Sequence, residues 1–439
     1  MNKSTNAQTA ALVFAMLTAV IPIIISYITI LPPQLQNDYP WLPSTILATV
    51  TLAFMALSTL QSREPQDNDQ SDQPMTEQRP YSPYIIGPPI KDPANFFGRQ
   101  PEVKRFFENL NGPQPQPLYV LGFRRAGKTS FLRHLSHPDV VRKNVRDAAT
   151  TLVIYIDLQA GIKTEADFYL ELAEGINRSL PKGKRLTLSL EPTRDRFMAW
   201  LDSPQLKGYR LIFLLDEFEA LTDEAGFDAY FFKTLRSMVS DRLLWVTSSY
   251  RDFYRLSRIN GPSENTSCFF NIFHPTPIIL GGLTAIEADD LIQKPATSVG
   301  VRFSSEEIVI MKRLAGELPF FLQIVAAAWF EAKQEGQDNF RKIKAQVKQK
   351  FLSGMRNHFY WYWLHFEEDE RELFSLLATE KSTDLSAYRE QHGNAVLNDL
   401  LNYGLIIREG QTYRIAGEVF AEWIREGVEM ESGADNESA

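Results

Sequence analysis

The feature that most constrains the fold is a glycine-rich loop between an apolar strand candidate and an amphipathic helix candidate. The strand candidate is PLYVL at 117–121, the loop is GFRRAGKTS at 122–130, and FLRHL follows at 131–135. The loop has the spacing G-x-x-x-x-G-K-[ST], and the order strand, loop, helix is the context that a phosphate-binding loop requires. Its glycines let backbone N–H groups face phosphate oxygens, and the helix N-terminus adds positive potential. The segment therefore predicts an α/β core that binds a nucleotide.

The loop spacing also predicts roles for individual side chains. Lys128 would reach the β- and γ-phosphates and act in catalysis, and Thr129 would bind Mg²⁺. The candidates for nucleotide contact are all nine loop residues: Gly122, Phe123, Arg124, Arg125, Ala126, Gly127, Lys128, Thr129 and Ser130.

A second apolar strand candidate ends in two acids. It is RLIFLL at 210–215, and Asp216 and Glu217 follow it. Alone, such a pair also fits solvated acids at a strand end. Beside a phosphate loop, Asp216 is expected to hold Mg²⁺, directly or through water, and Glu217 to act as general base toward the attacking water.

Further apolar runs alternate with helical periods and define the predicted fold class. Strands are expected at Leu152–Leu158, Leu243–Thr247 and Pro277–Leu280, with helices around 164–180, 192–202 and 228–240. Strands separated by helices predict a parallel sheet that helices cover on both faces, with the ligand at the carboxyl ends of the strands. The order of the strands in the sheet does not follow from the sequence.

Charge and cysteine content exclude several other classes of protein. The 46 basic and 54 acidic residues give a net charge of −8, which disfavours a generally basic nucleic-acid surface. The single cysteine, Cys268, cannot form an internal disulfide, and no Cys/His cluster has zinc spacing. This composition fits a reducing compartment.

The first 62 residues differ from the rest and predict a transmembrane helical hairpin. Apolar stretches at Ala10–Leu31 and Trp41–Leu60 carry no charge. The first would form a helix about 33 Å long, against a hydrocarbon core of about 30 Å. Lys3 and Arg63 flank the hairpin, so the following chain is expected on the cytoplasmic side of the cell (inner) membrane. The alternative is a cleaved signal peptide followed by a buried helix. Residues 63–86, rich in Gln, Asp, Ser and Pro, are expected to form a flexible linker.

With these motifs, the sequence resembles the AAA-like ATPases of the STAND class, close to the archaeal-type ATPase branch, over about residues 87–425. FFGR at 96–99 with Glu102 resembles the family motif F-x-G-R-x-x-E. GELPFFLQ at 316–323 resembles the lid motif G-G-x-P-x-x-L-Q, with Glu317 in place of the second glycine. The resemblance implies ATP and Mg²⁺ as ligands and adds these adenine-side candidates: Phe97, Gly98, Arg99 and Pro319.

The resemblance also implies an arginine that senses the γ-phosphate after the fourth strand. Many relatives have T-[ST]-R there, whereas this chain reads Thr247-Ser-Ser-Tyr-Arg251. Arg251 is the candidate sensor, and Ser248 is the alternative.

The resemblance implies a P-loop ATPase core at 87–282, a helical lid at 283–357 and a winged helix at 358–427, followed by an acidic tail at 428–439. Between Phe366 and Glu426 there are six basic and thirteen acidic residues, so the winged helix is expected to make protein contacts rather than to bind DNA. The basic run at 341–350 is interpreted as a solvated helix face. The aromatic run at 359–363 is interpreted as a packed seam between domains.

The leading functional hypothesis is a membrane-anchored STAND ATPase that hydrolyses ATP slowly and acts as a nucleotide-dependent signalling switch. It would have a protein partner of unknown identity and could form nucleotide-dependent homo-oligomers. The alternatives are a membrane-tethered, initiator-like ATPase that handles nucleic acid and a nucleotide-binding scaffold that does not hydrolyse. The choice of ATP over GTP comes from the family resemblance alone.

Overall fold

The computed structural model describes residues 81–437 except 182, 184–185, 187–192, 224–225, 251, 253–268, 338 and 380–384, with side chains to residue 427. Within these ranges no helix is both long and apolar enough to cross a bilayer. The two predicted spans, Ala10–Leu31 and Trp41–Leu60, lie outside the described residues, as does the candidate sensor Arg251.

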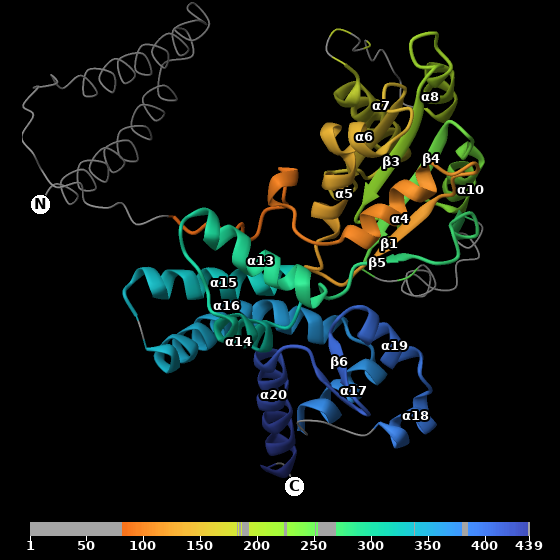
Figure 1. The fold of residues 1–439 in the computed structure, drawn as a ribbon. Helices are drawn as coiled ribbons and strands as arrows, with labels where there is room; N and C mark the ends of the chain where they lie inside the picture. The colour runs from red at the N-terminus through yellow and green to blue at the C-terminus, as the bar shows by residue number, and fades with distance from the viewer. Residues whose placement is uncertain are drawn as a thin grey trace, which may run out of the picture. The chain divides into compact units, whose positions relative to one another are not determined.

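A five-stranded parallel sheet forms the centre of the nucleotide-binding core (Figure 1). The strand order is β2-β3-β4-β1-β5. The strands are β1 (Leu118–Leu121), β2 (Thr151–Asp157), β3 (Arg210–Asp216), β4 (Leu243–Ser249) and β5 (Ile278–Ile279). Each lies where an apolar run predicts a strand, so the parallel α/β core is confirmed.

Alternate residues of the strands β2, β3 and β4 pack into separate clusters on the two faces of the sheet. On β3, Ile212 and Leu214 join one cluster, while Phe213 and Leu215 join the other. The first cluster includes apolar residues of α4 (Gln100–Leu110), α5 (Lys128–Ser136) and α6 (Pro138–Asn144). The second includes residues of α7 (Glu165–Ser179), α8 (Arg194–Leu201) and α10 (Ala229–Met238). Apolar side chains on both faces are expected of a parallel sheet that helices cover on both sides.

Four helices follow the sheet in the region predicted as the lid. They are α13 (Ala285–Ser298), α14 (Ser305–Ala315), α15 (Pro319–Gln334) and α16 (Phe340–His365). Reciprocal capping boxes begin the first two, Thr284 with Glu287 and Ser304 with Glu307, which fixes where each helix starts. Helix α16 is continuous across the predicted boundary between lid and winged helix at 357–358.

The C-terminal module, the region predicted as a winged helix, contains helices and a two-stranded hairpin. Helices α17 (Glu368–Thr379), α18 (Ser386–His392) and α19 (Ala395–Asn402) precede an antiparallel hairpin of β6 (Ile406–Glu409) and β7 (Thr412–Ile415). This order is compatible with a winged helix, and that assignment stays a prediction. Helix α20 (Glu418–Glu437) continues into the segment predicted as an acidic tail.

We call residues 280–284, between β5 and α13, the lid hinge. Its backbone and that of the C-terminal module meet at glycines. A Cβ atom on Gly404 would lie 2.2 Å from the backbone N of Gly282, and one on Gly281 would lie 2.0 Å from the carbonyl oxygen of Asn402. Gly404 also has a φ of +68°, in the left-handed region that favours glycine. No side chain fits in this contact, which joins the segment entering α13 to the turn before β6.

Candidate functional site

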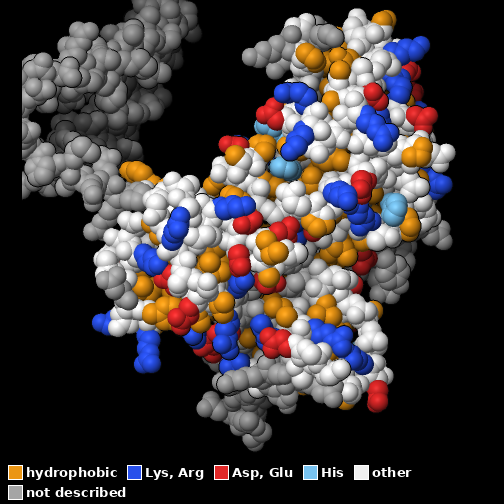
Figure 2. All heavy atoms as spheres, viewed as in Figure 1, with side chains coloured by type: hydrophobic (Ala, Val, Ile, Leu, Met, Phe, Trp, Pro, Cys, Tyr) orange, Lys and Arg blue, Asp and Glu red, His pale blue; other side chains and the backbone are white. Residues whose placement is uncertain are grey.

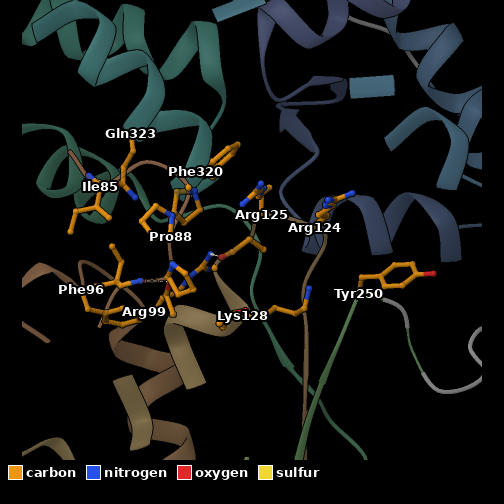
Figure 3. A pocket seen from close by; sticks show the side chains of 18 of the residues that line it. Ile85, Pro88, Phe96, Arg99, Arg124, Arg125, Lys128, Tyr250, Phe320 and Gln323 are labelled. Atoms are coloured by element: carbon orange, nitrogen blue, oxygen red, sulfur yellow. Dashed lines mark hydrogen bonds between the residues drawn. The ribbon is translucent and has the colours of Figure 1, made fainter. Parts of the chain in front are cut away.

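A cavity of about 560 Å³ lies at the carboxyl ends of the strands (Figure 3). Its walls come from the segment 85–99, the phosphate loop, the turn after β3, and helices α15 and α16. The predicted site residues that line it are Phe97, Arg99, Arg124, Arg125, Ala126, Gly127, Lys128, Thr129, Ser130, Glu217 and Pro319.

The phosphate loop presents a buried cation and a helix N-terminus to this cavity. Lys128 is the first residue of α5 and is 6% exposed, and its Nζ donates a 3.1 Å hydrogen bond to the carbonyl oxygen of Gly122. Among the described residues no carboxylate forms an ion pair with Lys128, and the first turn of α5 contains no acid. Gly127 has a φ of +94° and open space where a Cβ would be. A buried cation with open space beside it fits a phosphate group.

Gly122 and Phe123, which do not line the cavity, support the loop from behind. A Cβ on Gly122 would lie 3.0 Å from the carbonyl oxygen of Leu280. Phe123 is 4% exposed, and four aromatic rings from the C-terminal part of the chain surround it: Trp361, Tyr362, Phe366 and Tyr403. Both residues therefore set the position of the loop through packing.

Asp216 is buried at the end of β3 and is not part of the cavity wall. It is 1% exposed, and hydroxyl groups from both neighbouring strands donate to its carboxylate. The Tyr155 hydroxyl donates to Oδ2 at 2.9 Å, and the Ser248 hydroxyl donates to Oδ1. Ser248, the alternative candidate for the γ-phosphate sensor, thus contacts Asp216, and its role as a sensor stays a prediction.

Two glutamates bring acid into the cavity. Glu217, the predicted general base, has a φ of +54°, and its backbone N–H donates to Asp216 Oδ1 at 3.2 Å. Glu219 also lines the cavity although it is only 4% exposed, and its Oε1 accepts from the backbone N–H of Tyr250 at 3.4 Å. Burial raises the pKa of Glu219 to about 8; Lys128 opposes the rise and the neighbouring Glu217 adds to it.

The segment 85–99 and helix α15 form another part of the cavity wall. Phe96 stacks on His134 with ring centroids 4.2 Å apart, and the backbone N–H of Ile85 donates to the Gln323 side chain at 3.2 Å. Arg99 is 4% exposed, and its guanidinium donates to the carbonyls of Ala126, at 3.2 Å, and Gly281. Arg99 therefore ties the phosphate loop to the lid hinge.

Gly98 does not line the cavity. It has a φ of +79°, and a Cβ there would lie 2.9 Å from the Leu283 side chain, so this glycine permits close packing against the lid hinge.

Several residues in the cavity wall were not assigned to the site from sequence: Gln159, Glu219, Tyr250, Phe320, Gln323, Trp361 and His365. The motif LLDEFE at 214–219 could have pointed to Glu219, because it carries a third acid two residues after Glu217. Trp361 and His365 belong to α16, far along the chain from the other motifs, and no local pattern indicates them.

Sequence comparison decides the family. Residues 119–382 match the family described as Novel STAND NTPase 2. The chain belongs to this family. Among curated proteins, none matches the sequence.

Several solved structures align with this STAND NTPase, and a shared fold is inferred only from the first, whose TM-score exceeds 0.5. The Walker-type ATPase of Pyrococcus abyssi aligns with a TM-score of 0.52 at 18% identity, over 77% of this chain and 98% of that one. The ORC2 protein of Aeropyrum pernix, in its ADPNP–ADP complexes, aligns with a TM-score of 0.47 at 14% identity, over 80% and 97%. RuvB of Thermotoga maritima aligns at 0.38 and 13% identity, over 77% and 97%.

The family match and the phosphate loop together make this protein a P-loop NTPase of the STAND class. The buried lysine, the open helix N-terminus and the acids at the strand ends fit a nucleotide with a magnesium ion.

Proposed function

We propose that this STAND NTPase is a membrane-anchored ATPase that hydrolyses ATP slowly and acts as a nucleotide-dependent signalling switch. Lys128 and the loop N–H groups would bind the phosphates, and Glu217 would accept a proton from the attacking water. Thr129 and Asp216 would hold Mg²⁺, which when bound neutralises charge on the phosphate oxygens. The adenine would lie between Phe97 and Pro319, which both line the cavity.

One observation supports the switch hypothesis: side chains of helix α16 contact Arg124 in the phosphate loop. The Tyr362 hydroxyl donates a 2.5 Å hydrogen bond to the carbonyl oxygen of Arg124, and the Arg124 guanidinium lies 4.5 Å from the centroid of the Trp361 ring. A change of the loop on nucleotide binding would therefore act directly on α16. A contact that differs between nucleotide states is what a nucleotide needs in order to shift a population of conformers.

The support for membrane anchoring comes from the sequence. The two uncharged stretches within residues 1–62 support a hairpin in the cell membrane with the ATPase on the cytoplasmic side. Cross-linking or mass photometry in detergent, with and without ATP, would show whether the anchored protein forms homo-oligomers.

The nucleic-acid alternative gains no support from the surface charges. Within the basic run 341–350, Lys348 pairs with Glu422 at 2.6 Å and Lys350 pairs with Glu331. On the face shown in Figure 2, basic and acidic side chains are interspersed. Helix α19, at the place of a recognition helix, contains Asp399 and no Lys or Arg. Phosphate contacts dominate DNA affinity, so these surfaces suit protein contacts better.

The test is nucleotide binding and turnover by the full-length protein in detergent micelles, with limited proteolysis as the conformational readout. Wild type should turn over ATP slowly and give different proteolytic patterns with ATP and ADP. Lys128→Ala should lose binding, and Glu217→Gln should bind ATP without hydrolysing it. Lys104→Ala is a matched control, because this exposed lysine pairs with Glu108 on the surface of α4. Identical proteolysis in every nucleotide state would refute the switch, and absence of any nucleotide binding would refute the ATPase.

A further inference from the structure

We propose that Tyr155 and Ser248 are positioning residues that together fix the Asp216 carboxylate for magnesium binding. The inference rests on the proposed function, in which Asp216 contributes to holding the ion, and it names the two side chains that this role depends on.

Hydroxyl groups on the two strands that neighbour β3 hold the Asp216 carboxylate. We call Tyr155 and Ser248 together the clamp. Strand β3 lies between β2 and β4, and Asp216 is its last residue. From β2, the Tyr155 hydroxyl donates to Oδ2 at 2.9 Å, and from β4, the Ser248 hydroxyl donates to Oδ1. The backbone N–H of Glu217 adds a 3.2 Å bond to Oδ1. With donors on both oxygens, the carboxylate cannot rotate freely.

Burial makes the clamp effective. Asp216 is 1% exposed and Ser248 is fully buried, so water does not replace a lost donor at low cost. Donors on both oxygens therefore keep the carboxylate in one orientation toward a cation.

A third element connects the clamp to the phosphate loop. The Arg133 guanidinium lies 4.2 Å from the centroid of the Tyr155 ring. Arg133 belongs to α5, the helix whose first residue is Lys128. The phenol that orients Asp216 is thus packed against the same helix that presents the phosphate-binding groups.

The alternative role of Ser248, as a sensor in contact with the γ-phosphate, does not fit these positions. Its hydroxyl is already engaged, because it donates to Asp216. Loss of a group that orients a metal ligand typically lowers metal affinity by about 10- to 100-fold. We therefore expect Tyr155→Phe and Ser248→Ala to change the magnesium requirement rather than the binding of the nucleotide itself.

The experiment measures affinity for a fluorescent ATP analogue by the full-length protein in detergent, without Mg²⁺ and across a Mg²⁺ titration. Tyr155→Phe and Ser248→Ala should each raise the Mg²⁺ concentration at half-maximal effect by about 10-fold or more and leave the metal-free affinity unchanged. Asp216→Asn is the positive control. Tyr388→Phe is the matched control, because it also removes a phenol hydroxyl, one that donates to the backbone carbonyl of Asp369 at 3.0 Å in the C-terminal module.

Each other outcome overturns the inference in a recognisable way. If Asp216→Asn shifts the magnesium midpoint and the two clamp variants do not, Tyr155 and Ser248 have no positioning role. If Asp216→Asn has no effect, Asp216 does not serve the metal, although the nucleotide-binding function stands. If the clamp variants lower the metal-free affinity equally, their role is in the fold. If wild type binds no nucleotide, the proposed function fails with the inference.

Discussion

The hydroxyl of Tyr362 donates a hydrogen bond to the backbone carbonyl of Arg124, 238 residues earlier in the chain. Tyr362 belongs to α16 and is fully buried, and Arg124 lies in the loop that is expected to surround the phosphates. The contact therefore joins the part of the cavity that binds the ligand to the part of the chain that is expected to report it.

We expect Tyr362→Phe to lower the free energy of unfolding by about 1 kcal/mol, because it removes a hydrogen bond to the partly buried Arg124 carbonyl. Because the hydrogen bond from Tyr362 holds Arg124 in the phosphate loop, the variant should also release bound nucleotide faster than wild type. Urea unfolding and stopped-flow release of a fluorescent ADP analogue measure the two effects. Tyr388→Phe serves as control for phenol loss; an equal release rate in wild type and Tyr362→Phe would contradict the coupling.

Trp361 should report nucleotide binding by its own fluorescence. Its ring lines the cavity, stacks on His365 with centroids 3.7 Å apart, and lies beneath the Arg124 guanidinium. Added ATP should change the tryptophan emission of wild type, and Trp361→Phe should abolish that change. Trp363→Phe should retain it, since Trp363 faces Trp423 rather than the cavity. A nucleotide-dependent signal of unchanged size in Trp361→Phe would show that Trp361 is not the reporter.

The buried carboxyl of Glu219 should make stability fall as pH rises. Its pKa in the folded state is raised to about 8 by burial, opposed by Lys128 and reinforced by Glu217, whereas the unfolded carboxyl has the ordinary value of 4.5. The folded state thus holds this proton more tightly, so the contribution is complete below about pH 4.5 and is lost as pH rises through 8. Glu219→Gln should be the more stable protein at pH 9, by on the order of 1 kcal/mol or more, and should lose this advantage at pH 5.

Thermal unfolding of wild type and Glu219→Gln at pH 5, 7 and 9 measures the difference. Glu108→Gln, on the exposed face of α4, controls for loss of a surface charge. A stability difference between wild type and Glu219→Gln that does not vary with pH would be inconsistent with a buried, protonated Glu219.

Gly404→Ala should destabilise the protein by about 3 kcal/mol or more, because the new methyl would overlap the backbone of Gly282 and strain a positive φ. Gly410→Ala separates the two causes. Gly410 has a similar φ, +64°, but open space around it, so only the strain of about 1 kcal/mol applies. Denaturant unfolding compares the two variants. Equal losses of unfolding free energy in the two variants would mean that the contact between Gly404 and Gly282 can accommodate a methyl group without destabilisation.

Local patterns were enough to predict the sheet and the loop. The strands are short apolar runs buried on both faces, and the loop carries fixed glycines and a lysine at fixed spacing, so neither depends on distant residues. The direction of a carboxylate does depend on distant residues. Asp216 turns toward Tyr155 and Ser248 because these lie on adjacent strands, and strand order does not follow from local sequence.

Dependence on distant residues also explains why the sequence does not predict Trp361 and His365 as part of the cavity wall. Trp361 belongs to a run of aromatic residues that was interpreted as a packed seam, and Tyr362 does pack there, against Phe123 with ring centroids 4.7 Å apart. Which ring of such a run faces a ligand depends on how α16 is rotated against the loop, and that rotation is a property of the folded core. The spans in residues 1–62 and the candidate Arg251 remain predictions, since they lie outside the described residues.

Helix α16 has a mechanical consequence. Its 26 residues without a break form a rod about 39 Å long, with the cavity residues Trp361 and His365 in its last turns. A rod tilted by about 5° at one end moves its other end by about 3 Å, which is comparable to the width of an atom. Displacements too small to disturb the loop itself would thus be magnified at the far end, near Phe340, where a partner could detect them.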